Sequence, residues 1–194
     1  MTRSAALRLH CGDAVDATRW LDDADDVDAR VLRHVVGPVL DIGCGPGRHV
    51  VALAERGVVA LGIDIAASAL AVARGRGAIT LERSVFSRVP ASGRWRTAMM
   101  LDGNVGIGGD PEALLRRVRE LLAVGGSAIV EADPAVPGRA THTVRLEVGD
   151  TPGPWFELTP VAIDDIAGLA LRSGFRVMTQ WSDGRRHFAH LVSR

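Results

Sequence analysis

The stretch Val39-Leu40-Asp41-Ile42-Gly43-Cys44-Gly45-Pro46-Gly47, followed by a helical pattern through Ala54, decides the fold of this chain. An apolar run enters a glycine-rich turn and leaves it as a helix, so backbone N–H groups are exposed to a closely approaching ligand. Asp41 stands inside the motif, ahead of the first glycine. Its carboxylate would repel a dinucleotide pyrophosphate but not a ligand that carries a cationic amine. The motif therefore predicts a strand, a ligand-binding loop and a helix.

A second apolar run, residues 58–63, follows that helix and ends on Asp64. In a doubly wound sheet, an acid at the carboxyl end of the second strand accepts hydrogen bonds from a ribose diol that lies across the first turn. This interpretation fits NAD and S-adenosylmethionine equally well. The two acids together thus predict a nucleoside ligand at the strand ends.

With these residues in place, the chain resembles the class I S-adenosylmethionine-dependent methyltransferases, whose first motif runs acid-x-Gly-x-Gly-x-Gly. The resemblance extends from about Val39 to the C-terminus and is most specific from Val39 to Asp64. It implies that the loop wraps the methionine part of the cofactor and that Asp64 binds the ribose. The cofactor residues we predict are Asp41, Gly43, Cys44, Gly45, Gly47, His49, Asp64, Ile65, Ser84, Val85 and Leu101.

Each of these features also has a structural explanation. The glycine turn can serve tight packing alone, and Asp64 can be an ordinary helix-capping acid. Cys44 is interpreted as a small residue between glycines, because no adjacent base would activate it as a nucleophile. Ser84 stands where the family often has an acid near the adenine amine, which leaves the adenine contact to the backbone and Val85.

From Asp41 onward, apolar strands alternate with helical patterns, which predicts a parallel α/β sheet with helices on both faces. We expect strands over 78–81, 97–101 and 127–131, and helices over 67–76 and from 110 to the paired glycines 125–126. A helix over 164–173 precedes two strands, 175–181 and 186–192, around the hairpin turn 182–184. The terminal hairpin favours the methyl donor over a nicotinamide. The predicted fold is the class I methyltransferase fold, a Rossmann-like, doubly wound, seven-stranded sheet with an antiparallel last strand.

Composition sets the broad class of protein. The 194 residues are 47% hydrophobic, which fits a single globular domain over 1–194. The formal net charge is zero and no basic block occurs, which argues against nucleic acid and anionic membranes as partners. Two cysteines and the absence of an apolar leader predict a reduced, cytoplasmic protein. The sequence does not define an oligomeric state.

Two regions lie outside the cofactor frame and are the expected sources of substrate specificity. Residues 1–36 are predicted to form an N-terminal helical cap, with a helix through Val31, Leu32 and Val35. Residues 134–160 are predicted to form a substrate-side insertion with an extra strand over 141–148, which could lie over the site as a lid.

The loop after residues 97–101 supplies the predicted catalytic residues, Asp102 and Asn104. Strand carboxyl ends are where such sheets bind ligands, so both should lie near the transferred methyl. Asp102 is a candidate general base or a group that orients the acceptor, whereas the alternative is a plain turn capped by Asn104. No metal site is predicted, because no tight His, Cys and carboxylate spacing appears.

We therefore expect methyl transfer from S-adenosylmethionine to a small-molecule acceptor, with S-adenosylhomocysteine as the product. The acceptor's O, N or C atom is not defined by the sequence. Two alternatives remain: a fold that binds the cofactor without transfer, as a scaffold, regulator or cyclase, and a nicotinamide-dependent enzyme.

Overall fold

A mixed sheet of seven strands forms the centre of the computed structural model, which describes residues 4–135 and 140–194. Its order is β11-β12-β7-β6-β3-β4-β5. The strands are β3 (Val39–Ile42), β4 (Ala60–Asp64), β5 (Thr80–Glu82), β6 (Trp95–Met100), β7 (Leu122–Ala132), β11 (Phe175–Asp183) and β12 (Arg186–Ser193). Strands β5, β4, β3, β6 and β7 pair in parallel, and β12 is antiparallel to both its neighbours. The predicted fold, including the antiparallel last strand, is confirmed.

Helices cover both faces of this sheet because its strands are apolar on both sides. One face packs against α4 (Pro111–Leu121) and α5 (Ile166–Arg172), preceded by η4 (Ile163–Asp165). The other packs against α1 (Asp26–Val31), η2 (Leu32–His34), α2 (Arg48–Glu55) and α3 (Ala67–Gly75). The doubly wound arrangement leaves the carboxyl ends of the parallel strands free at one edge.

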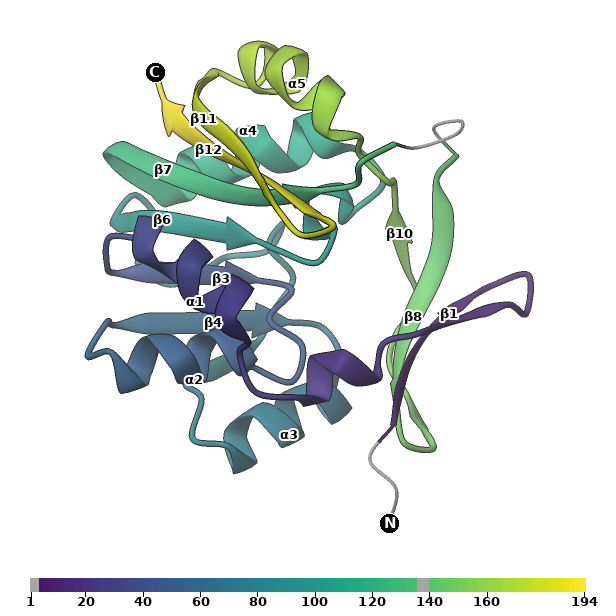
Figure 1. Ribbon diagram of the computed structural model, residues 1–194. Coiled ribbons are helices and arrows are strands. Elements are labelled where there is room, and N and C mark those ends of the chain that lie inside the picture. The colour runs from purple at the N-terminus through teal and green to yellow at the C-terminus, as the bar shows by residue number, and fades with distance from the viewer. Residues whose placement is uncertain (1–3, 136–139) are drawn as a thin grey trace.

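A second, five-stranded sheet stands beside that edge, the side toward which the arrowheads of β4 and β6 point in Figure 1. It contains β1 (Ala5–Leu9), β2 (Ala14–Asp16), β8 (His142–Val148), β9 (Thr151–Pro152) and β10 (Phe156–Leu158). Its strands come from two distant parts of the chain, residues 5–16 and 142–158, since β1 pairs with β8. The predicted extra strand over 141–148 is therefore present as β8.

Three local predictions need correction. The region 1–36 begins with β1 and β2, because residues 5–9 pair with β8 and turn at Gly12, where φ is +106°. Its helical part is limited to η1 (Thr18–Leu21), α1 and η2, so Val35 lies beyond the helix. The helix from 110 ends at Leu121 rather than at Gly125-Gly126, because residues 122–126 already belong to β7. Residues 1–3 and 136–139 of the two specificity regions lie outside the described residues.

Candidate active site

The loop between β3 and α2 uses its three glycines for different purposes. All have positive φ, +72° at Gly43, +50° at Gly45 and +82° at Gly47. A Cβ at Gly47 would lie 2.7 Å from the Cβ of Ala73, so Gly47 lets α2 and α3 approach each other. A Cβ at Gly43 would lie 2.6 Å from Asn104 Nδ2, whereas one at Gly45 would meet nothing within 4 Å. Of the three, Gly45 is therefore the one that opens onto free space.

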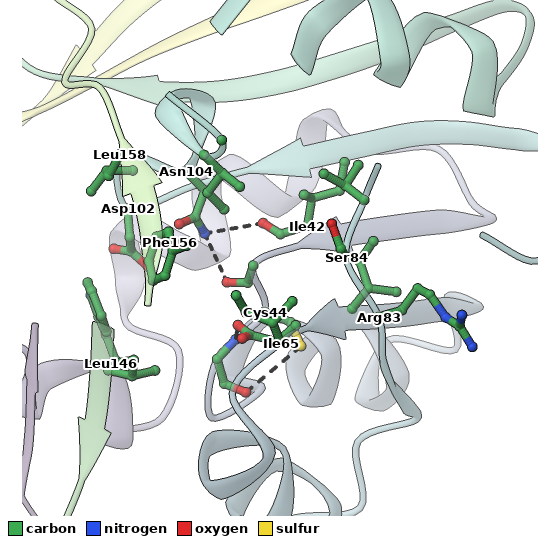
Figure 2. Close-up of a pocket in the computed structure, with 18 of the residues that line it drawn as sticks. Ile42, Cys44, Ile65, Arg83, Ser84, Asp102, Asn104, Leu146, Phe156 and Leu158 are labelled. Atoms are coloured by element: carbon green, nitrogen blue, oxygen red, sulfur yellow. Dashed lines mark hydrogen bonds between the residues drawn. The ribbon is translucent and has the colours of Figure 1, made fainter. Parts of the chain in front are cut away.

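That free space is a cavity of about 1090 Å³, including its opening to solvent, above the carboxyl ends of β3, β4 and β6. Figure 2 shows its two sides: Asp102, Leu146, Phe156 and Leu158 lie on one, and Arg83 and Ser84 on the other. The first side includes the second sheet, which supplies Leu7, Leu146, Phe156 and Leu158. The glycine loop lies between the two sheets, so a ligand on it would be covered by the second sheet.

Asp64, at the end of β4, is held by backbone N–H groups. Gly45 N donates to Asp64 Oδ2 and Ala66 N donates to Asp64 Oδ1, both at 2.8 Å. Burial raises the pKa of Asp64, and these two N–H groups oppose that effect. Two carboxylate oxygens have further lone pairs beyond these bonds. Asp64 is thus a fixed acceptor on the cavity wall, as a ribose diol requires.

A buried ionic network lies under the Asp102 side of the cavity. Arg48 Nε donates to Asp28 Oδ2 at 3.0 Å, and Arg186 donates to Asp28 Oδ1 at 2.7 Å and to Glu131 at 2.8 Å. His49 Nε2 lies 3.1 Å from Asp28 Oδ1. Burial alone would raise the pKa of Asp28, but His49 and the two guanidinium groups hold it well below its usual range. The network joins α1, α2, β7 and β12 beneath the site.

Asp41 belongs to this network only weakly. Its side chain is 2% exposed, and Oδ2 has no hydrogen-bond partner among the described residues. The Nδ1 atom of His49 lies 3.9 Å from that oxygen. Burial raises the pKa of Asp41 to about 6, against the effect of His49 and with a further increase from Asp102. Asp41 is therefore a buried carboxylate without adequate compensation.

Asp102 follows β6 with φ at +55°, a conformation that a non-glycine residue rarely adopts. Its backbone N–H donates to Glu131 Oε2 at 2.8 Å, and its carboxylate is bound by Arg48 NH2 at 2.9 and 3.0 Å. Arg19, from η1, donates to it at 2.8 Å. Because two guanidinium groups already bind the carboxylate oxygens, this geometry suits an orienting group better than a proton acceptor.

Asn104 lies beside Asp102 in η3 (Asn104–Gly106) and fastens the glycine loop. Its Nδ2 donates to Ile42 O at 3.2 Å and to Gly43 O at 2.9 Å, as the dashed lines in Figure 2 show. The amide nitrogen is therefore occupied by the loop, and the remaining function of Asn104 toward a ligand lies in its oxygen.

The structure brings most of the predicted site residues to one cavity. Its lining includes Gly43, Cys44, Gly45, His49, Asp64, Ile65, Ser84, Val85, Asp102 and Asn104. Gly47, Leu101 and Asp41 lie outside the lining: Gly47 packs on α3, Leu101 is fully buried, and Asp41 lies next to His49. Cys44 packs over Gly62, and burial raises its thiol pKa, so it is no nucleophile.

The sequence prediction missed Arg48, Trp20 and the pairing of β1 with β8, although it placed residues 134–160 on the substrate side. Arg48 is the first residue of α2, where the helix dipole disfavours a positive charge. A cation at that position, beside a glycine loop, was a signal that carboxylate partners exist. Trp20, Leu7 and Leu146 gave no such signal, because β1 and β8 meet only through pairing between distant segments.

Comparison with known proteins agrees with this geometry. Residues 39–126 match the family described as "Methyltransferase domain". The match covers 88 of the 194 residues, and over that part the chain is similar to a methyltransferase domain. The matched residues run from the start of β3 into β7 and so contain the glycine loop, Asp64 and Asp102. The resemblance drawn from the first motif is thereby confirmed.

Two relatives and two solved structures place the domain among known proteins. An uncharacterised protein of Mycobacterium tuberculosis is 31% identical over 144 residues, 74% of this chain and 48% of that protein. The trans-aconitate 2-methyltransferase of Paracidovorax citrulli is 29% identical over 77% of this chain and 56% of that enzyme. The chain thus spans about half the length of the curated relatives it matches.

Among solved structures, a methyltransferase from Bacteroides fragilis in complex with S-adenosyl-L-homocysteine superposes with a TM-score of 0.80 at 21% identity. It covers 100% of this chain and 89% of that one. The 1,6-didemethyltoxoflavin-N1-methyltransferase of Burkholderia thailandensis gives 0.66 at 17% identity over 90% and 80% of the two chains. These likenesses establish the class I methyltransferase fold.

Proposed function

We propose that this chain transfers a methyl group from S-adenosylmethionine to a small-molecule acceptor. The observation that carries the proposal is the pair formed by Gly45 and Asp64: a loop residue that opens onto the cavity, and a carboxylate fixed beside it by the loop's own N–H. This cradle fits a nucleoside with a free diol. The match of residues 39–126 to a methyltransferase domain supports the same ligand.

The charges beneath the cavity fit the amino-acid part of this ligand. Four carboxylates, those of Asp28, Asp41, Asp102 and Glu131, face three guanidinium groups, those of Arg19, Arg48 and Arg186. Among these carboxylates, Asp41 has a buried Oδ2 without a hydrogen-bond partner in the described part of the chain. The α-ammonium of a methionine moiety in the cavity would favour the ionised form of Asp41.

The residues of the chain then act by binding, orienting and excluding water. When bound, S-adenosylmethionine supplies an electrophilic methyl group, which the acceptor's lone pair takes while the C–S electron pair returns to sulfur. An acceptor that gains one CH₂ overall also releases a proton, which passes to water. Asp64 holds the ribose, Ile65 and Val85 border the adenine side, and Asp102 orients the reacting end. The second sheet, built from the regions 1–36 and 134–160, covers the acceptor side.

The charge of the chain and the shape of the cavity also bear on its binding partners. A neutral chain with an enclosed cavity suits a small molecule rather than nucleic acid or a membrane surface. In the described part of the chain, no helix has the length and apolar character that crossing a bilayer requires.

Calorimetry with S-adenosylhomocysteine, S-adenosylmethionine and NAD tests the proposal directly. The first two should bind and NAD should not. Asp64→Ala should lose about tenfold or more in affinity, because a charged hydrogen bond contributes about 1.5–3 kcal/mol. Glu55→Ala, an exposed carboxylate on α2, is the matched control and should bind like the parent protein.

Turnover separates an enzyme from a protein that only binds the cofactor. The purified protein, S-adenosylmethionine and a metabolite extract should yield S-adenosylhomocysteine together with an acceptor heavier by one CH₂. Binding without any product across broad acceptor panels would contradict methyl transfer and favour the scaffold, regulator or cyclase alternative.

A further inference from the structure

The face that the second sheet turns to the cavity is apolar at every position that lines it. Leu7 of β1 and Leu146 of β8 are cross-strand neighbours, and Phe156 of β10 is paired with Val144 beside them. Leu158 follows on the same face of β10. Figure 2 shows Leu146, Phe156 and Leu158 gathered on one side of the cavity.

Asp102 lies on the same side of the cavity as Leu146 and Phe156, but its carboxylate is bound by Arg48 and Arg19. The other charged groups belong to the floor or to the opposite side. Arg48, His49 and Asp102 are joined in the ionic network, and Asp64 is held by the glycine loop. Arg83 lies beside Ser84, across the cavity from Leu146 and Phe156 (Figure 2). An acceptor under the second sheet therefore meets hydrocarbon, and a carboxylate there would lose its hydration without compensation.

Trp20 brings one polar atom to these apolar surroundings. Trp20 of η1 lines the cavity, and its indole Nε1 is buried without a hydrogen-bond partner among the described residues. Its segment adjoins β1, and the neighbouring Arg19 reaches Asp102. An indole N–H is a donor only, so it is complemented by a carbonyl oxygen or a ring nitrogen. A buried donor without a partner lowers the stability of the protein by about 1–3 kcal/mol, and a ligand that accepts its hydrogen bond removes this penalty.

We propose that the acceptor is a neutral aromatic or heteroaromatic molecule, bound against Leu7, Leu146, Phe156 and Leu158, whose oxygen or nitrogen accepts a hydrogen bond from Trp20. This inference rests on the proposed function, since it concerns the acceptor of that reaction. It excludes polycarboxylates as acceptors, because the residues of the second sheet that line the cavity, in the described part of the chain, carry no positive charge to bind them.

The test measures binding to the full chain saturated with S-adenosylhomocysteine. The neutral probes for calorimetry are bicyclic heteroaromatics such as 4-quinolone. Each is paired with a carboxylate analogue such as quinoline-4-carboxylate, and trans-aconitate is a further anionic probe. Neutral members should bind at least about tenfold more tightly than their carboxylates. Equal or tighter binding of the anions, or no binding by any neutral probe, would overturn the acceptor class. Failure of S-adenosylhomocysteine itself to bind would instead refute the proposed function.

Variants locate the acceptor within the cavity. Trp20→Phe keeps the apolar ring and removes the donor, so it should weaken 4-quinolone roughly five- to tenfold while the Kd of S-adenosylhomocysteine stays unchanged. An effect on S-adenosylhomocysteine alone would assign the N–H to the cofactor and overturn this part. Phe156→Arg should reverse the preference toward the anions, and Phe156→Gln is the milder version if folding suffers. Glu157→Gln, on the outer face of the same strand, should leave both preferences unchanged.

Discussion

Replacing Asp41 with asparagine should stabilise the ligand-free protein and lower its affinity for S-adenosylmethionine. Asp41 is fully enclosed, one of its oxygens lacks a partner, and its pKa is raised from 3.8 to about 6 by burial. Its charged form is therefore less favourable in the folded protein than in the unfolded chain. Asparagine has nearly the same shape and no charge, so the substitution removes this penalty.

The magnitude follows from the linkage between protons and folding. Between pH 3.8 and about 6, the folded protein holds a proton on Asp41 that the unfolded chain has lost, so stability falls as pH rises. At about 1.4 kcal/mol per pH unit, the loss sums to about 3 kcal/mol and is complete above pH 6. Asp41→Asn should thus raise the free energy of unfolding by up to about 3 kcal/mol at pH 7.5 and by little below pH 4.

Urea unfolding of both proteins at half-unit steps from pH 4 to pH 8 measures this difference, because the parent protein's other titrations cancel in the comparison. Asp28 titrates with the opposite sign, since its pKa is lowered, and it is present in both proteins. A difference that is flat with pH, or a variant less stable at pH 7.5, would refute the account of Asp41. In the same samples, affinity for S-adenosylmethionine should fall, because the variant lacks the buried negative charge that favours an ammonium nearby.

Three further substitutions test single contacts. Gly47→Ala should destabilise the fold by roughly 1–3 kcal/mol in urea unfolding, since its Cβ would overlap that of Ala73, and a near-native midpoint would contradict this. Gly45→Ala places its methyl in open space and should cost only about 1 kcal/mol of backbone strain. It should lower the affinity for S-adenosylhomocysteine in calorimetry, and an unchanged affinity would contradict binding of the ligand at the loop. Asp102→Asn should lower kcat roughly tenfold or more with a smaller change in cofactor affinity, and an unaltered kcat would return Asp102 to a turn residue.

The main sheet could be predicted from the sequence because its signals are local. The glycine loop, the apolar strands and the terminal hairpin each occupy a few consecutive residues. The end of α4 was misplaced because Gly125-Gly126 looks like a helix stop, whereas the helix ends at Leu121. Leucine and valine at 122–124 suit a helix or a strand, and pairing with Trp95 of β6 decides for the strand.

The second sheet could not be predicted because it depends on pairing between residues about 140 positions apart. Leu7 faces Leu146, and neither segment reveals its partner. The ionic network was missed for the same reason: the carboxylates of Asp28 and Glu131 look like surface charges until α1 and β12 bring Arg186 between them. Only Arg48 gave a local signal.

The two halves of the site differ in how they use buried polarity. Under the cofactor side, the chain buries an uncompensated carboxylate and a left-handed Asp102, which both reduce stability in the ligand-free state. Under the acceptor side, it buries hydrocarbon and one unpartnered N–H. An ammonium in the cavity would favour the charged form of Asp41 without contacting it, and an acceptor would supply a partner for the Trp20 N–H. Binding at both ends should therefore raise stability more than contact area alone predicts. The gain in stability should be large for a cationic methionine moiety, because it interacts with a buried charge. It should be small for a neutral acceptor, because that ligand adds a single hydrogen bond.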